Sequence, residues 1–294
     1  MALSNNHEIV SILDLKYRQT PVHFSFSYGN AVIKFDNEDD PSKLELCISG
    51  RRNMGLVKLK DIFFLIWEML YFFTGFFPRL LNIAFDGNED KDYPRKIVRL
   101  RSTTEKLSLI RSNNRLCFIS PENLNGSTLK KYALLKEALK YPLNSLFAVQ
   151  SYDDIYGEHR FVLASHAAEG IVEEKYESQL ENHGCKNGFK NRIEFLFKPL
   201  LDANRKHKTN IFKSIGVPQK TYFQLLKNTR DFYSHLARER RRFRKGKEFI
   251  SDYWILSLAI RLFILQEIGV NYEVPLFKAN ASAIAEWIAE YRKN

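Results

Sequence analysis

Cysteine is scarce in this chain of 294 residues, and its scarcity argues against two kinds of protein. Cys47, Cys117 and Cys185 are far apart and odd in number, and no two of them form a Cys-x-x-Cys pair. We therefore expect neither a disulfide framework nor a zinc site. The same scarcity is typical of proteins in a reducing compartment, so we expect a cytoplasmic location.

Several nucleotide-binding and catalytic motifs are also missing. The sequence has no glycine-rich loop of the Walker or Rossmann type and no Gly-x-Ser-x-Gly elbow. The acidic stretch at residues 86–92 looks like a calcium loop, but it lacks the closing glutamate of an EF-hand. The first residues lack a basic segment followed by an apolar one, so we expect no secretion signal. Neither a metal nor a cofactor is expected.

One long apolar run, Asp61 to Leu81, has to be distinguished from a membrane span. It is interrupted by Glu68 and Gly75 and stopped by Pro78, which leaves it short of the roughly 20 apolar residues that cross a bilayer. We interpret it as a buried amphipathic helix and expect no membrane partner. A membrane-surface protein that uses this helix together with a basic segment is the alternative.

Positive charge is abundant and concentrated in one segment. The formal net charge is +11, and residues 186–247 hold 18 Lys and Arg against 4 Asp and Glu. An excess of this kind favours an anionic partner, either nucleic acid or a membrane surface. A solvated basic surface is the alternative, but concentration in one segment favours a binding function.

The first part of the chain predicts a mostly antiparallel β-sheet with at least one packed helix. The alternating runs of residues 23–35 surround Gly29-Asn30, which is a hairpin signal. A further strand is expected over residues 43–50, and a helix over residues 61–77. The period-2 pattern returns at residues 95–102 and 106–120.

After Pro121 the pattern becomes helical, so the fold class is predicted to be α+β. Ser127 is the expected cap of the first helix, and Pro199 the expected break in a later one. The nearly apolar segment 246–269 should be the central buried helix. We expect a β-rich sensor or regulatory domain over residues 1–145 and a helical domain over residues 146–294. Helices are predicted over residues 127–141, 159–183, 187–207, 218–237, 246–269 and 280–294.

The sequence Arg230-Asp231-Phe-Tyr-Ser-His235 has a composition suited to phosphate chemistry. Histidine exchanges a proton near neutral pH, and arginine binds a phosphate and the charge that develops on it. Asp231 is suited to orienting a cation. Five residues span about 140° around an ideal helix, so the arginine and the histidine share a face only if the helix ends, bends or meets a second copy.

The residues around this motif suit the binding of RNA. Tyr233 is a candidate for stacking on a base or donating a hydrogen bond. The cations that follow the motif would hold the phosphate backbone without reading its sequence. These are Arg238, Arg240, Arg241, Arg242, Arg244, Lys245 and Lys247. Among the other histidines, His159 and His166 are expected to be structural or exposed, and His207 to belong to the same basic face.

On these residues the chain resembles the HEPN family, whose signature is an arginine, four to six residues and then a histidine. Arg230, Asp231 and His235 match it, with the polar residue that commonly follows the arginine. The order of a β-rich N-terminal part and a helical C-terminal part also resembles the ApeA-type HEPN proteins of bacterial anti-phage defence. The resemblance implies a metal-independent ribonuclease whose two motifs face each other in a homodimer. Arg230, His235 and Asp231 are the catalytic residues it implies.

We therefore expect an endoribonuclease of an anti-phage, abortive-infection or toxin system. Its partners would be RNA, with tRNA among the candidates, and a second copy or more of the same chain. A phage-derived activator or a regulatory partner is expected to control it. The alternative is a non-catalytic HEPN-like module that binds RNA, a nucleotide or a partner subunit of a defence complex.

Overall fold

The fold is described from a computed structural model of the chain. Its packing divides the chain into two units, one made of residues 1–134, 150–153 and 268–270 and the other of the remaining residues. The structure describes residues 7–14, 23–37, 43–51, 54–75, 78–86, 88–89, 123–151, 157–182, 188–209, 211–235, 243–245, 247–274 and 277–278.

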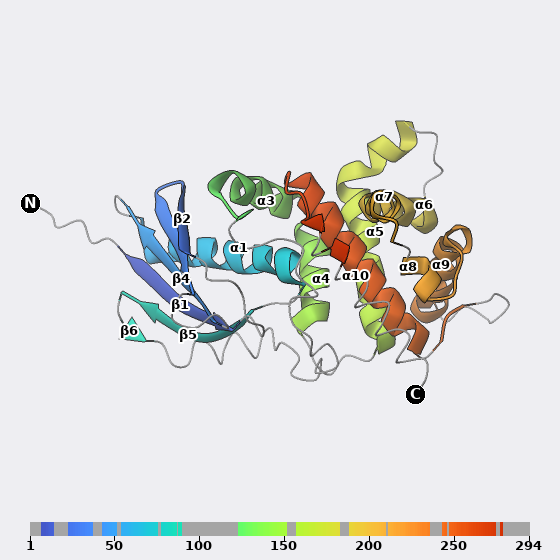
Figure 1. Ribbon diagram of the computed structural model, residues 1–294, viewed down its shortest axis with the longest axis horizontal. Coiled ribbons are helices and arrows are strands. Elements are labelled where there is room, and N and C mark those ends of the chain that lie inside the picture. Colours follow the sequence, from blue (N-terminus) through green and yellow to red (C-terminus); the bar gives the residue numbers. More distant parts are fainter. Residues whose placement is uncertain are drawn as a thin grey trace, which may run out of the picture. The chain divides into compact units, whose positions relative to one another are not determined.

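The first unit contains a six-stranded sheet in the order β2-β3-β4-β1-β5-β6, with every described pairing antiparallel (Figure 1). One face of the sheet is apolar because alternate side chains point the same way. Ala31, Ile33 and Phe35 are buried on β3, as are Leu44 and Leu46 on β4. The strands are β1 (Glu8–Asp14), β2 (His23–Tyr28), β3 (Ala31–Asp36), β4 (Lys43–Gly50), β5 (Arg79–Phe85) and β6 (Asn88–Glu89).

The predicted hairpin at Gly29-Asn30 is confirmed. Tyr28 on β2 pairs with Ala31 on β3, which leaves Gly29 and Asn30 as the two turn residues. Gly29 has φ 55°, a left-handed conformation that glycine adopts without the steric cost of a Cβ atom.

The helix predicted over residues 61–77 is confirmed, but it runs from Leu56 to Thr74, and the apolar run continues after Pro78 into a strand that was not predicted. Helix α1 (Leu56–Thr74) packs against β1 and β4 and ends where Gly75 takes φ 87°. The Gly75 amide donates a 2.8 Å hydrogen bond to the carbonyl of Tyr71, which closes the helix. After Pro78 the chain enters β5. Helix and strand are both apolar here, so the hydrophobic pattern did not separate them.

Helix α3 (Gly126–Ala138) begins at a different cap from the expected one. The Asn125 side-chain oxygen accepts hydrogen bonds from the amides of Ser127 and Thr128, at 3.0 and 3.1 Å. Asn125 rather than Ser127 therefore satisfies the free amides at the start of this helix. Within the first unit, the hydroxyl of Tyr132 donates to the buried carboxylate of Glu68 on α1 at 3.5 Å.

The remaining described helices confirm the predicted helical pattern. Phe197 separates α6 from α7, and Pro199 occupies the first turn of α7, as expected for a break. Residues 251–265 of α10 are all buried, so this helix forms the centre of the second unit. The helices are α4 (Lys140–Ser151), α5 (Gly157–Asn182), α6 (Phe189–Leu196), α7 (Lys198–His207), α8 (Ile211–Ser214), α9 (Gln219–His235) and α10 (Lys247–Glu267).

The α+β fold class is confirmed by the antiparallel sheet of the first unit and the helices of the second. The strands predicted over residues 95–102 and 106–120 lie outside the described residues, as does the helix predicted over residues 280–294.

Candidate active site

The candidate motif lies at the end of helix α9. This helix is amphipathic: Tyr222, Phe223 and Leu226 are buried on one face, at spacings that bring them onto adjacent turns. His235 is the last residue of α9, so Arg230 and His235 belong to one uninterrupted helix. Their backbone positions are therefore about 140° apart around its axis. Helix geometry alone does not put both side chains on one face.

Arg230 is held in a fixed orientation by two carboxylates and an aromatic ring. Its guanidinium donates to Glu169 on α5, and to the neighbouring Asp231 at 3.0 Å. Its central carbon lies 4.7 Å from the ring centre of Phe189 on α6. The side chain is only 15% exposed, and its Nε is buried without a hydrogen-bond partner. One donor therefore remains unused, although the other nitrogens are engaged.

Glu169 joins Arg230 to a wider ion-pair network. It also accepts a 3.0 Å hydrogen bond from Arg192 on α6, and Arg192 in turn pairs with Glu177 at 3.0 Å and Glu173 at 3.3 Å. The hydrogen bond to Glu177 is the main reason why the pKa of Arg192 is raised. Helices α5, α6 and α9 thus meet through side chains separated by up to 61 positions in the sequence.

The carboxylates of this network outnumber its cations. Glu169, Glu173, Glu177 and Asp231 give four negative charges, and Lys227, Arg192 and Arg230 give three positive ones. The network therefore carries a formal charge of −1 and is not itself a phosphate-attracting surface. The excess of positive charge in this part of the sequence lies instead in the segment that follows His235.

Asp231 is suited to accepting hydrogen bonds rather than to giving up a proton. Burial tends to raise the pKa of its carboxyl, but Lys227 and Arg230 outweigh this effect and lower the pKa overall. The Lys227 ammonium lies one turn earlier, at 2.5 Å from the Asp231 carboxylate. Asp231 therefore stays ionised at neutral pH and contacts two cations, while its supporting role in catalysis stays a prediction.

Tyr233 is packed inside an aromatic group rather than presented as an open stacking surface. Its ring lies 5.3 Å from that of Phe249 and 6.1 Å from that of Phe243, both nearly perpendicular to it. Phe243 also stacks on Phe232 at 3.9 Å. These contacts fix residues 243–245 against the end of α9. The expectation that Tyr233 stacks on a base stays a prediction.

Arg244 does not belong to the exposed basic surface, which corrects its predicted role in binding RNA. Its side chain is 4% exposed and lies 2.5 Å from the fully buried carboxylate of Asp252 on α10. Its backbone amide donates to the hydroxyl of Thr229, directly before Arg230, at 3.0 Å. A guanidinium paired inside the core cannot reach an RNA backbone. Arg244 therefore anchors the end of the basic segment.

The other predicted RNA-binding residues are only partly described. Lys245 is exposed, and its ammonium lies 4.8 Å from the ring centre of Phe243. His235 and Lys247 are described only as the ends of α9 and α10. Arg238, Arg240, Arg241 and Arg242 lie outside the described residues.

Sequence reasoning missed one histidine that lies beside the motif. The Nε2 atom of His166 on α5 is 3.3 Å from the hydroxyl of Ser234, the residue before His235. His166 lies three residues before Glu169, so the two side chains share a face of α5. This spacing could not identify His166 from the sequence, because Glu169 is recognised as a partner of Arg230 only in the structure. His207, in contrast, bonds the hydroxyl of Tyr272 at 3.0 Å, so its predicted place on the basic face is not supported by this contact.

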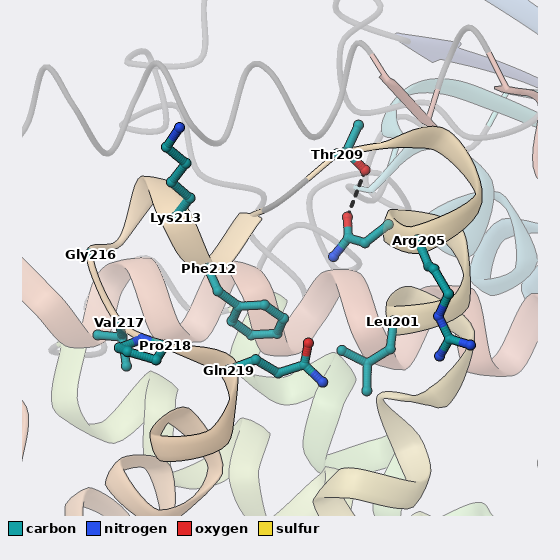
Figure 2. Close-up of a pocket in the computed structure, with 10 residues that line it drawn as sticks. Leu201, Arg205, Thr209, Phe212, Lys213, Gly216, Val217, Pro218 and Gln219 are labelled. Carbon is teal, nitrogen blue, oxygen red and sulfur yellow. Dashed lines mark hydrogen bonds between the residues drawn. The ribbon is translucent and has the colours of Figure 1, made fainter.

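A pocket of about 500 Å³ lies where α7 ends and α9 begins (Figure 2). It combines the cations Arg205 and Lys213 with the ring of Phe212. Gln219, the first residue of α9, also lines it, and Arg230 comes eleven residues later. That separation is about 16 Å along the helix axis. This pocket is therefore distinct from the motif.

The described residues hold neither a metal site nor a membrane-spanning helix. Within those residues, no group of three or more His, Cys, Asp or Glu side chains is arranged to hold a metal ion. No helix in the described part of the chain is both long and apolar enough to cross a bilayer.

Comparison with known proteins places the motif in a recognised domain. Residues 151–274 match the family model described as Apea-like HEPN, and this range contains helices α5 to α10 and the candidate motif. Neither the curated proteins nor the solved structures give a match. At the level of the family, the match indicates a HEPN-type nuclease of anti-phage defence.

Proposed function

Since residues 151–274 form an Apea-like HEPN domain, we propose that the chain is a metal-independent endoribonuclease of anti-phage defence. The observation that carries the proposal is the Arg-Asp-x-x-x-His motif at the end of α9, inside the matched domain. Within this domain, Arg230 and His235 are five positions apart in the sequence, and they directly precede a strongly basic segment.

The proposed reaction needs no metal ion. The ribose 2′-oxygen attacks the neighbouring phosphorus while its proton passes to a base. The bond from phosphorus to the 5′-oxygen then breaks, and this oxygen receives a proton from an acid. The products are a 2′,3′-cyclic phosphate and a 5′-hydroxyl. His235 exchanges a proton in this scheme, and Arg230 stabilises the charge that develops on the phosphoryl oxygens.

The position of Arg230 suits a role in the transition state more than a role in initial capture. Glu169 and Asp231 already neutralise its charge and hold it still. A preorganised donor of this kind stabilises developing charge without having to reorganise. The first attraction of RNA would come from the exposed cations near the motif, because long-range attraction depends on their summed charge.

A second copy of the chain would explain the angular separation of the two motif residues. Two α9 helices facing each other would bring the arginine of one motif near the histidine of the other. We therefore propose a homodimer with a composite site. The first unit is proposed to act as a regulatory module that responds to a phage-derived activator, because a free ribonuclease would damage its host.

The second candidate function is binding of RNA or a partner without cleavage. It is favoured by one observation: Arg230 is engaged by two carboxylates, which is also how a purely structural arginine looks. In this reading the motif stabilises the packing of α5 against α9, and the basic segment alone contacts the ligand.

Incubation with tRNA and with total RNA in EDTA distinguishes the two functions. The nuclease is expected to produce fragments that end in a 2′,3′-cyclic phosphate or a 3′-phosphate, because attack comes from the 2′-oxygen. End-group analysis of the fragments and a mobility-shift assay on the same samples measure cleavage and binding together. Shifted but intact RNA would support the binding function. Cleavage only after addition of Mg²⁺ would contradict the proposed mechanism.

A further inference from the structure

His166 faces the end of the motif from a neighbouring helix. Helices α5 and α9 pack against each other, and two pairs of side chains connect them. Glu169 pairs with Arg230, and His166 shares a 3.3 Å hydrogen bond with Ser234. Residues 166 and 169 are three apart and residues 230 and 234 are four apart, so each pair lies on one face of its helix.

This matching places an imidazole about one helical turn from the Arg230 guanidinium. One turn is about 5.4 Å along the axis. His166 is exposed, whereas the Arg230 side chain is largely buried. An imidazole that is open to solvent therefore lies beside a guanidinium that is largely enclosed.

The proposed reaction creates a need that the motif alone does not meet within one chain. Attack by the 2′-oxygen releases one proton, and departure of the 5′-oxygen consumes another. Two proton-exchanging groups serve these steps best, and each motif contains one histidine. In the proposed composite site, His166 of the chain that supplies Arg230 would be one of these groups and His235 of the other chain the second.

We propose that His166 is a second proton-exchanging catalytic residue of this site, acting on RNA together with His235. The inference rests on the proposed ribonuclease function and adds a residue that the HEPN signature does not contain. Ser234 is a positioning residue in this scheme, since its hydroxyl contacts the His166 ring and limits its rotation. Charged side chains of the ion-pair network lie on the same helices: Glu169 on the helix of His166, Arg230 and Asp231 on α9, and Arg192 on α6.

The test compares single-turnover RNA cleavage by the full-length wild-type protein and the His166→Gln and His166→Ala variants, from pH 5 to pH 9 in EDTA. Loss of a general acid or base costs about 10²- to 10⁴-fold in rate. We expect a loss in this range for both variants and the disappearance of one limb of the pH–rate profile. Added imidazole should restore part of the rate of His166→Ala, which a merely structural role would not produce.

A matched control uses another exposed histidine of the same helix. His159 lies seven residues before His166 on α5, which is about 10 Å along the helix axis. The His159→Gln variant is expected to cleave within about threefold of the wild type, because loss of a solvent-exposed histidine outside the site removes no proton transfer. Melting curves for all variants show whether a loss of rate reflects unfolding.

The failures of the two proposals are distinguishable. If wild-type protein cleaves RNA and His235→Ala does not, while His166→Gln keeps the wild-type rate and pH profile, the His166 proposal is overturned and the proposed function stands. If imidazole fails to raise the rate of a folded but slow His166→Ala variant, the proton-exchanging role is likewise rejected. If wild-type protein leaves every RNA intact in EDTA, both alone and with an extract of phage-infected cells as the source of activator, the proposed function itself fails.

Discussion

Replacement of Arg230 by lysine is expected to lower the rate of RNA cleavage by about 100-fold or more, although the positive charge is kept. The guanidinium contacts Glu169 and Asp231 at the same time, and its central carbon lies 4.7 Å from the ring centre of Phe189. Lysine has a single ammonium on a flexible chain and cannot reproduce these directions. Single-turnover rates at saturating protein measure the effect without contributions from RNA binding.

The control for this substitution is a charge-conserving change at an exposed arginine of the same domain. Arg205 is 82% exposed and pairs with Asp202 at 3.4 Å. Arg205→Lys is expected to cleave within about twofold of the wild type, because surface ion pairs contribute little and the charge is unchanged. If Arg230→Lys is folded and cleaves as fast as Arg205→Lys, the guanidinium has no catalytic role.

Removal of Arg244 is expected to destabilise the protein by about 3–5 kcal/mol at neutral or higher pH. Its partner Asp252 is completely buried in α10, so Arg244→Ala leaves a carboxylate in the core without its counter-charge. Replacing both residues by apolar ones, in the double variant Arg244→Met with Asp252→Leu, should recover most of that stability. Denaturant unfolding of the wild type, both single variants and the double variant measures the coupling. Equal losses in the single and double variants would contradict a buried pair.

This pair also predicts a dependence of stability on pH. Burial raises the pKa of Asp252 to about 7, and the nearby Arg244 limits the rise. Between pH values of about 4 and 7 the folded state then binds a proton that the unfolded chain has released. The free energy of unfolding should therefore fall as the pH rises through this window. Asp252→Asn should remove this contribution, so a comparison of both proteins at pH 5 and pH 8 isolates it.

Loss of the Arg244 anchor should affect function as well as stability. The Arg244 amide bonds Thr229, and the neighbouring Phe243 stacks on Phe232. These contacts attach the end of the basic segment to the helix that carries the motif. The cations proposed to bind RNA at residues 238–242 directly precede this anchor in the sequence.

The first hairpin and most helices could be predicted from the sequence because the signals that specify them are local. Alternation predicted the hairpin at Gly29, and the nearly apolar segment predicted the burial of α10. Strand β5 was missed because it follows α1 within one apolar run. There the stop at Gly75 depends on its left-handed backbone rather than on hydrophobicity.

The site was predicted less completely, because its contacts join distant parts of the chain. The motif itself is contiguous and was found directly. Nothing near Arg230 in the sequence identifies Glu169 as its partner, since 61 positions separate them. Arg244 was grouped with the other cations of its segment by composition, yet Asp252 inside an otherwise apolar helix is the kind of buried charge that requires a cationic partner.

The cleavage rate of His235→Ala in EDTA tests the central claim most directly. If the motif histidine transfers a proton, this variant stays folded, binds RNA as tightly as the wild type and cleaves it at least about 100-fold more slowly. A His235→Ala protein that produces the same fragments at the wild-type rate would contradict the assignment of the site.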